Sequence, residues 1–172
     1  MNYILQTKRL KLREFTLQDD KDLLKILADG GMPPLAQFGQ LNLEYTQEFI
    51  KIIMKSYKEN GFGLWAVVEK DNENLIGYCG LHKVKINEND GAIELAYRIY
   101  KELWGKGFAT EAAVAVKNYA FDTLRLTEIV SCIAHDNERS MNVAKKVGLK
   151  YWKEGVFKGK PCRVYRIENS NK

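Results

Sequence analysis

The stretch that decides the fold is YRIYKELWGKGFATEAA, residues 97–113. An apolar, strand-like segment passes through a turn at Gly105 and Gly107 into an alanine-rich segment that is typical of a helix. Glycine lets the backbone bend tightly and lets an anion approach its N–H groups. The first turn of a helix adds unpaired N–H donors and the positive end of the helix dipole. The order of strand, glycine turn and helix therefore predicts a phosphate-binding site.

Two widespread phosphate-binding motifs do not fit this turn. The P-loop needs Ser or Thr after its Gly-Lys pair, but Gly107 follows Lys106. The dinucleotide fingerprint needs a third small residue where Thr110 stands, and it lies early in a strand-helix-strand unit rather than this far along a chain. The two glycines also fit a plain strand-to-helix connection, so the turn alone leaves that alternative open.

A second motif lies downstream. A strand-like segment, residues 128–134, leads into HDNERS, residues 135–140, and then into a helix that ends in KVGL, residues 146–149. The two motifs in this order resemble the GNAT superfamily of acyl-CoA-dependent N-acyltransferases, whose loop pattern Gln/Arg-x-x-Gly-x-Gly/Ala falls on residues 104–109. Trp104 takes the place of the usual Gln or Arg. The motif that contains this tryptophan, together with Asn137-x-x-Ser140, resembles the motifs of the branch that contains the ribosomal-protein N-terminal acetyltransferases.

The resemblance implies a fold and a cosubstrate. The fold is a single mixed α/β domain over residues 1–172, with a central twisted mixed β-sheet flanked by helices. Acetyl-CoA would lie in a splay between two adjacent parallel strands, residues 92–99 and 128–134. Backbone groups of the first strand would hold the pantetheine arm, and the amides of the glycine turn would hold the pyrophosphate. The cofactor-binding residues expected on this basis are Tyr97, Ile99, Trp104, Gly105, Lys106, Gly107, Phe108, Ala109, Thr110, Asn137 and Ser140.

Glu94 is the candidate general base. It lies on the face of the strand that also carries Ala92 and Ala96, so small neighbours leave space beside its carboxylate. A carboxylate there can accept the proton of an attacking amine or anchor a cationic one. The alternative is a surface glutamate without a catalytic role that pairs with Arg98 or with a lysine.

The residue that would protonate the leaving thiol, the general acid, differs from that of the wider superfamily. Many members carry a tyrosine where this chain has Ala144. The resemblance offers Ser140 as the substitute, with Asn137 bound to the pantetheine or thiol region. Asn137 and Ser140 are also good helix N-caps, and both roles stay open. His135 ends a strand near the expected cleft and could act at neutral pH.

The composition is that of a globular protein. The 172 residues are 45% hydrophobic and 28% charged, enough for one domain with a sizeable core. No apolar run approaches about 18 residues, and the amino-terminal residues lack the apolar centre of a signal peptide. We therefore expect a cytoplasmic protein without a membrane segment. The three cysteines, Cys79, Cys132 and Cys162, show no paired spacing, so neither a disulfide framework nor a metal site is expected. Cys132 is more simply a buried structural thiol than a nucleophile.

The net charge of +5 is unevenly placed. From Lys145 onward nine Lys and Arg face two Glu, which gives +7 and leaves −2 for the preceding residues. This segment suits an anionic cofactor and equally RNA or a ribosomal surface. A solvated face that keeps the protein soluble remains an alternative.

Hydrophobic periodicity predicts the other elements. Strands are expected at residues 9–15, 64–68 and 75–83, and a basic hairpin at 150–167 that turns near 158–161. Helices are expected after the capping residue Thr16 and at residues 44–60, 108–124 and 139–147. Residues 32–41 should form a loop, in which Phe38 either contacts the acceptor or packs the loop down.

The leading hypothesis is an acetyl-CoA-dependent N-acetyltransferase in which a primary amine attacks directly in a ternary complex. The acceptor would be a protein N-terminus, a polyamine or another small amine, and a homodimer is a common state in similar proteins. Two alternatives stay open: a non-catalytic acyl-CoA-binding module, and an RNA- or ribosome-docking domain that uses the basic carboxy-terminal segment.

Overall fold

The computed structural model describes residues 3–29, 41–87 and 90–170, and Phe38 and most of its predicted loop lie outside them. Eight strands form one sheet in the order β1-β2-β3-β4-β5-β6-β8-β7. The elements in chain order are β1 (Tyr3–Gln6), β2 (Leu10–Arg13), α1 (Asp20–Ala28), α2 (Leu43–Asn60), β3 (Leu64–Glu69), β4 (Leu75–Ile86), β5 (Asp90–Ile99), α3 (Phe108–Asp122), β6 (Glu128–Ile133), α4 (Glu138–Val147), β7 (Lys150–Phe157) and β8 (Lys160–Glu168).

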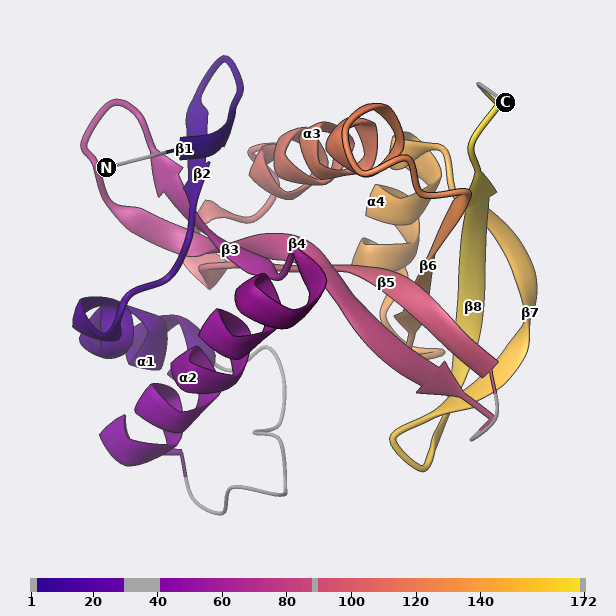
Figure 1. Ribbon diagram of the computed structural model, residues 1–172, viewed down its shortest axis with the longest axis horizontal. Helices are drawn as coiled ribbons and strands as arrows, with labels where there is room; N and C mark the ends of the chain where they lie inside the picture. The colour runs from indigo at the N-terminus through magenta and orange to yellow at the C-terminus, as the bar shows by residue number, and fades with distance from the viewer. Residues whose placement is uncertain (1–2, 30–40, 88–89, 171–172) are drawn as a thin grey trace.

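The helices cover both faces of the sheet (Figure 1). Helices α3 and α4 lie on one face, and α1 and α2 lie on the other, near the amino-terminal strands. The β7–β8 hairpin forms the far end of the sheet. The predicted mixed α/β fold, with a central sheet flanked by helices, is therefore confirmed.

Capping residues mark where the helices begin and end. The Asn42 side chain accepts from the Tyr45 N–H at 2.8 Å at the start of α2, and Gly61, with φ of 74°, ends that helix. Asn137 caps α4 in the same way, and Gly148 ends it with φ of 103°. These are the residue types that satisfy the free N–H and C=O groups of helix ends, which is why the predicted helices agree closely with the observed ones.

Two parts of the amino-terminal half differ from the prediction. Strand β1 was not predicted, although it pairs with β2 and forms one edge of the sheet. Strand β4 extends to Ile86 and strand β5 begins at Asp90, so both strands are longer than the predicted segments 75–83 and 92–99. A long antiparallel pair can carry polar residues into a hairpin because its ladder hydrogen bonds do not depend on side-chain type.

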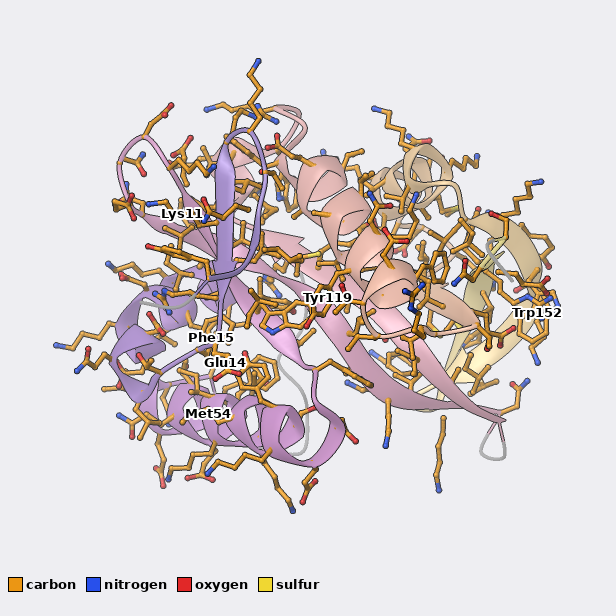
Figure 2. All side chains as sticks on the ribbon, turned by 45° about the horizontal axis from the view of Figure 1, so that its top comes forward. Lys11, Glu14, Phe15, Met54, Tyr119 and Trp152 are labelled. Atoms are coloured by element: carbon orange, nitrogen blue, oxygen red, sulfur yellow. The ribbon has the colours of Figure 1, made fainter. Side chains whose placement is uncertain are left out.

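The face that carries α1 and α2 has two separate apolar clusters. One, under those helices, includes Phe15, Ile50 and Tyr78, and the other, under the β7–β8 hairpin, includes Val130 and Cys162. In Figure 2, Phe15 and Met54 lie at the α1–α2 end, whereas Trp152 lies at the opposite end. The opposite face has one large cluster, in which α3 packs on the sheet. On the face that carries α1 and α2, neither apolar cluster reaches the middle of the sheet, so polar residues can lie there.

Candidate active site

Strands β5 and β6 are parallel and soon separate. In the described part of the chain, Glu94 and Val130 are the one residue pair recorded between them. Just beyond that pair, the hydrogen bonds between the two strands join a side chain of one strand to a backbone group of the other. The Ser131 hydroxyl donates to the Leu95 carbonyl at 2.8 Å, and the Cys132 N–H donates to Glu94 Oε1 at 2.8 Å. Glu94 and Ser131 are each about 5% exposed as whole residues, so these two bonds are shielded from water and close the narrow end of the gap.

The backbone of β5 faces this gap at alternate residues. The Leu95 carbonyl points toward β6, because Ser131 bonds to it, whereas the Tyr100 N–H donates to the Ile76 carbonyl on the β4 side. Since successive residues of a strand direct their polar groups to opposite neighbours, the backbone groups of Tyr97 and Ile99 also point toward β6. They lie where the two strands have already separated.

The glycine turn lies at the wide end of the gap. Gly105 and Gly107 have φ of 80° and 83°, a left-handed conformation that favours glycine. The first intrahelical bond of α3 runs from the Glu111 N–H to the Gly107 carbonyl at 3.0 Å. The N–H groups of Phe108, Ala109 and Thr110 therefore have no acceptor within their own helix. A Cβ built on Gly105 meets nothing within 4 Å, so the outer side of the turn is open.

Trp104 fixes the turn to the end of β5. Its indole N–H donates to the Ile99 carbonyl at 2.7 Å. The Arg139 guanidinium, from the first turn of α4, lies 4.6 Å from the centre of the Trp104 ring. A cation over an indole ring is an attractive contact, so the two sequence motifs meet in space. Sequence reasoning missed Arg139, and its presence inside the second motif was the available signal.

A second support of the turn comes from the β1–β2 connection. The Arg9 Nε donates to Glu111 Oε2 at 2.7 Å, and the Arg9 Nη1 donates to the Lys106 carbonyl at 2.9 Å. The Thr7 hydroxyl donates to the other Glu111 oxygen at 2.6 Å, and these bonds together lower the pKa of the carboxyl against the effect of burial. The Lys106 side chain is exposed. No local sequence signal links Arg9 to Glu111, which lie 102 residues apart.

Glu94 pairs with a histidine, not with Arg98. Its Oε2 lies 2.8 Å from the Nε2 of His82, the residue directly opposite on β4. The Arg98 Nε instead donates to the Ile26 carbonyl at 3.0 Å and closes the C-terminal end of α1. The alternative of a surface glutamate paired with Arg98 is therefore wrong, because Glu94 is buried and Arg98 is bound to another element.

The second motif forms the start of α4. Asn137 Oδ1 accepts from the Ser140 N–H at 3.1 Å, so Asn137 is the N-cap and Ser140 is the third helical residue. The Tyr97 hydroxyl donates to the Ser140 carbonyl at 3.1 Å and ties β5 to α4, and burial raises its pKa to about 12. Ala144 is 3% exposed and belongs to the core. Of the two predicted caps, only Asn137 has that role.

The remaining candidates lie to the side of Glu94. Cys132, partly buried, faces the same side of the sheet, and burial together with the Glu94 charge raises its pKa above its usual range. A raised pKa makes a thiol a poor nucleophile. His135, which follows β6, forms an exposed pair with Glu154 on β7, with 2.6 Å between Nε2 and Oε2. Cys132 therefore does not resemble an activated nucleophile, and His135 is paired with Glu154 rather than with Glu94.

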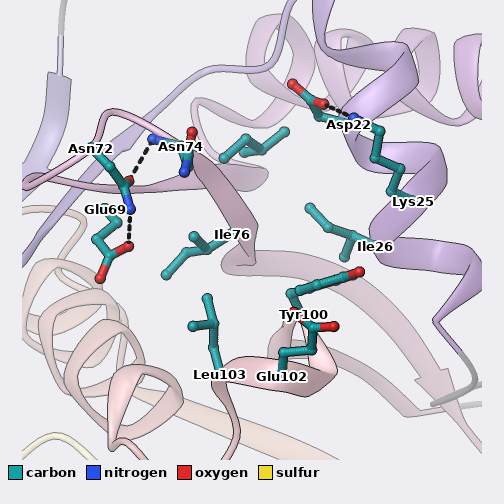
Figure 3. A pocket seen from close by; sticks show the side chains of 11 residues that line it. Asp22, Lys25, Ile26, Glu69, Asn72, Asn74, Ile76, Tyr100, Glu102 and Leu103 are labelled. Atoms are coloured by element: carbon teal, nitrogen blue, oxygen red, sulfur yellow. Dashed lines mark hydrogen bonds and ion pairs between the residues drawn. The ribbon is translucent and has the colours of Figure 1, made fainter.

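Two shallow hollows lie elsewhere on the surface. One, of about 410 Å³, is shown in Figure 3 and lies between α1, the β3–β4 connection and the turn after β5. Its lining includes Asp22, Glu69 and Glu102. The other, of about 340 Å³, lies on the β7–β8 hairpin beside Glu154. Neither is lined by Glu94, Ser140 or the glycine turn.

Comparison with known proteins identifies the family. The model of the acetyltransferase (GNAT) domain matches residues 9–150. The chain belongs to the GNAT acetyltransferase family. The GNAT chain is 31% identical over 169 residues to the uncharacterized N-acetyltransferase YoaA of Bacillus subtilis, covering 96% of this chain and 89% of that protein.

Solved structures share the GNAT fold at lower identity. The ribosomal L7/L12 alpha-N-protein acetyltransferase RimL in complex with coenzyme A has a TM-score of 0.80 at 14% identity, covering 99% of this chain and 100% of that one. The spermidine N-acetyltransferase SpeG of Vibrio cholerae has a TM-score of 0.72 at 20% identity, covering 95% and 96%. The protein is thus an acyltransferase, and the family uses acetyl-CoA as its acyl donor.

Three further observations concern metal ions, membranes and charged partners. Among the described residues, no group of three or more His, Cys, Asp or Glu could hold a metal ion. No helix in the described part of the chain is long and apolar enough to cross a membrane. In the basic segment, Arg166 pairs with Glu128 and Glu168, and Arg163 lies 3.9 Å from Glu154, so part of its charge is neutralised.

Proposed function

We propose that this protein transfers the acetyl group of acetyl-CoA to a primary amine by direct attack in a ternary complex. The observation that carries the proposal is the buried carboxylate of Glu94 at the closed end of a gap whose open end meets a glycine turn and a helix N-terminus. A carboxylate suits an ammonium group, and free N–H groups suit phosphate. The two ends of the gap therefore suit the two substrates.

The chain's own backbone would hold acetyl-CoA. The backbone groups of Tyr97 and the N–H of Ile99 face the gap and would bond an extended arm in the manner of an added strand, whereas the Ile99 carbonyl is already bound to Trp104. The N–H groups of the turn and the first turn of α3, residues 105–110, would bind the pyrophosphate, and the open space at Gly105 fits this role. Lys106 adds positive charge there, and Trp104 and Asn137 hold the two sides in place.

Acetyl-CoA supplies the activated acetyl thioester, and the protein supplies proton transfer and orientation. Glu94 accepts a proton from the acceptor ammonium, because only the neutral amine can attack a carbonyl carbon. Its burial keeps water away from the carboxylate. Ser140 is proposed as the residue that returns a proton at the leaving thiol, since Ala144 has no proton to give. The Tyr97 hydroxyl is already bound to the Ser140 carbonyl.

The acceptor is proposed to be a protein N-terminus or a polyamine. Solved structures with this fold include a ribosomal-protein alpha-N-acetyltransferase and a spermidine acetyltransferase, and both groups present a primary amine. A protein N-terminus is our first choice, because the basic segment beside the active site also suits a ribosomal surface.

The test is release of free thiol from acetyl-CoA in the presence of N-terminal peptides of ribosomal proteins, spermidine and free lysine. We expect turnover with at least one amine and a fall of at least about 100-fold for Glu94→Gln, as general base catalysis typically contributes. Binding of acetyl-CoA without turnover on any amine would favour the non-catalytic alternative.

A further inference from the structure

His82 has no part in the mechanism described so far, although it contacts the proposed base. We propose that His82 carries the proton from Glu94 to solvent, so that the two residues form a relay. This inference rests on the proposed function, because it assigns a positioning and proton-transfer role at the same site.

The geometry makes a direct transfer possible. His82 on β4 and Glu94 on β5 are cross-strand partners, and Nε2 lies 2.8 Å from Oε2. This is hydrogen-bond distance, so a proton can move between them without an intervening water. The Glu94 side chain is 7% exposed and that of His82 is 29% exposed, so the pair connects a buried carboxylate with solvent.

The carboxylate is held so that it presents one oxygen to His82. The Cys132 N–H donates to Oε1 at 2.8 Å, and this bond fixes the rotation of the group. Because a carboxylate oxygen has two lone pairs, each oxygen can still accept a further proton or hydrogen bond. Glu94 can therefore bind the acceptor and His82 at the same time.

The other polar groups around Glu94 are poor carriers at neutral pH. Burial raises the pKa of the Cys132 thiol and of the Tyr78 hydroxyl on β4, so both stay protonated. Burial also raises the pKa of the Cys162 thiol on β8. Arg98 is always charged and is bound to α1. Burial lowers the pKa of Lys158, in the β7–β8 turn, and the Glu94 charge offsets only part of this shift. Histidine is the side chain that readily takes up and releases protons near neutral pH.

The proton balance is as follows for an ammonium acceptor. Glu94 takes one of the three protons of the acceptor ammonium group. The neutral amine then attacks the thioester carbon, so that a C–N bond forms and the C–S bond breaks. The second proton leaves with the coenzyme thiol, and the third stays on the amide. The first proton passes from Glu94 to Nε2 of His82, which begins as the Nδ1–H tautomer, and Nδ1 releases one proton to water. Exchange of the ring protons with water then restores the Nδ1–H tautomer before the next turnover. One proton per turnover reaches solvent, and Glu94 is again a carboxylate.

The test compares His82→Gln and His82→Ala with His135→Gln. Glutamine places a donor close to the position of Nε2 but cannot carry a proton. The relay predicts that kcat of His82→Gln falls at least about tenfold while KM for the amine changes less than about threefold. His135 forms a similar but exposed pair with Glu154, so His135→Gln should keep the wild-type kcat. A wild-type kcat for His82→Gln would overturn the relay.

Chemical rescue separates proton transfer from packing. Imidazole should restore part of the activity of His82→Ala, because the site is partly exposed, and more basic methylimidazoles should restore more. Rescue that does not depend on basicity would mean that the histidine only fills space, and the relay would be wrong. Acetyl-CoA affinities measured by calorimetry should match the wild type for both His82 variants. The unfolding midpoint should match it for His82→Gln, whose amide can still donate to Glu94, and should fall for His82→Ala, which leaves the carboxylate without this partner.

The two proposals fail in different ways. If the wild type turns over an amine, Glu94→Gln does not, and His82→Gln behaves as the wild type, the relay is wrong and the proposed function stands. If the wild type turns over no amine, the proposed function is wrong and the relay with it.

Discussion

The Glu94 carboxylate accepts a hydrogen bond from the backbone N–H of Cys132, at 2.8 Å, where β5 and β6 separate. A side chain thus takes the place that a backbone carbonyl holds in a continuous parallel ladder. One residue away, the Ser131 hydroxyl does the same for the Leu95 carbonyl. The gap is therefore specified by two polar residues inside apolar strands, and one of them is the proposed base.

This double role separates two substitutions at Glu94. Glutamine keeps an oxygen for the Cys132 N–H, so Glu94→Gln should lose activity but keep nearly the wild-type unfolding midpoint. Alanine leaves the partly buried Cys132 N–H without its partner, which costs about 1–3 kcal/mol, so Glu94→Ala should lose both activity and stability. Denaturant unfolding and thiol release measured on the same preparations check this. Equal destabilisation by both variants would contradict the assigned bond.

The glycine turn offers a matched pair of variants. Gly105 and Gly61 have φ of 80° and 74°, and a Cβ on either meets nothing within 4 Å. Alanine should therefore cost about 1–2 kcal/mol of stability at both positions, from the left-handed backbone alone. Only Gly105→Ala should weaken coenzyme A binding, because its Cβ enters the proposed phosphate site. Calorimetric titration of both variants tests this, and equal affinities would place the phosphates elsewhere.

Two variants at the start of α4 distinguish the helix-capping role of Asn137 from the proposed proton-transfer role of Ser140. The cap bond uses the backbone N–H of Ser140 and the side chain of Asn137. Ser140→Ala should therefore keep the unfolding midpoint and lower kcat, whereas Asn137→Ala should lose about 1 kcal/mol of stability. Thermal unfolding and steady-state kinetics of the two variants distinguish the roles. A normal kcat for Ser140→Ala would leave protonation of the thiol to water.

The Tyr97 hydroxyl gives a pH-dependent prediction. Burial raises its pKa from 10.0 to about 12, so the folded state holds this proton more tightly than the unfolded state. The stabilisation is complete below about pH 10 and is lost as the pH rises toward 12. Tyr97→Phe should therefore lose less stability than the wild type over that range, as measured by urea unfolding at several pH values. A steeper loss in the variant would mean that the hydroxyl is not buried.

Local patterns made most of the fold predictable from the sequence. Asn42 and Gly61 carry the cap signals of α2, and Gly105 and Gly107 mark the turn before α3, because each residue type satisfies a local backbone requirement. Strand β1 was missed since four residues with little alternation carry a weak signal. Its position depends on pairing with β2, which is a tertiary contact.

The site was only partly predictable for the same reason. Glu94 and Asn137 lie inside recognisable patterns, so the sequence alone names them as candidates. His82, Ser131 and Arg9 act across strands or across 102 residues of chain, and no spacing in the sequence records such contacts. The register of β4 against β5 brings His82 opposite Glu94, and register is set by the whole hairpin.

The most direct test of the central claim is thermal unfolding with acetyl-CoA, free coenzyme A or NAD at equal concentrations. A ligand at about 100 times its dissociation constant stabilises a protein by roughly 2.7 kcal/mol, which is readily seen as a shift of the midpoint. The account predicts that acetyl-CoA and coenzyme A both raise the midpoint and that NAD does not. An unchanged midpoint with both coenzymes at saturating concentration would contradict it.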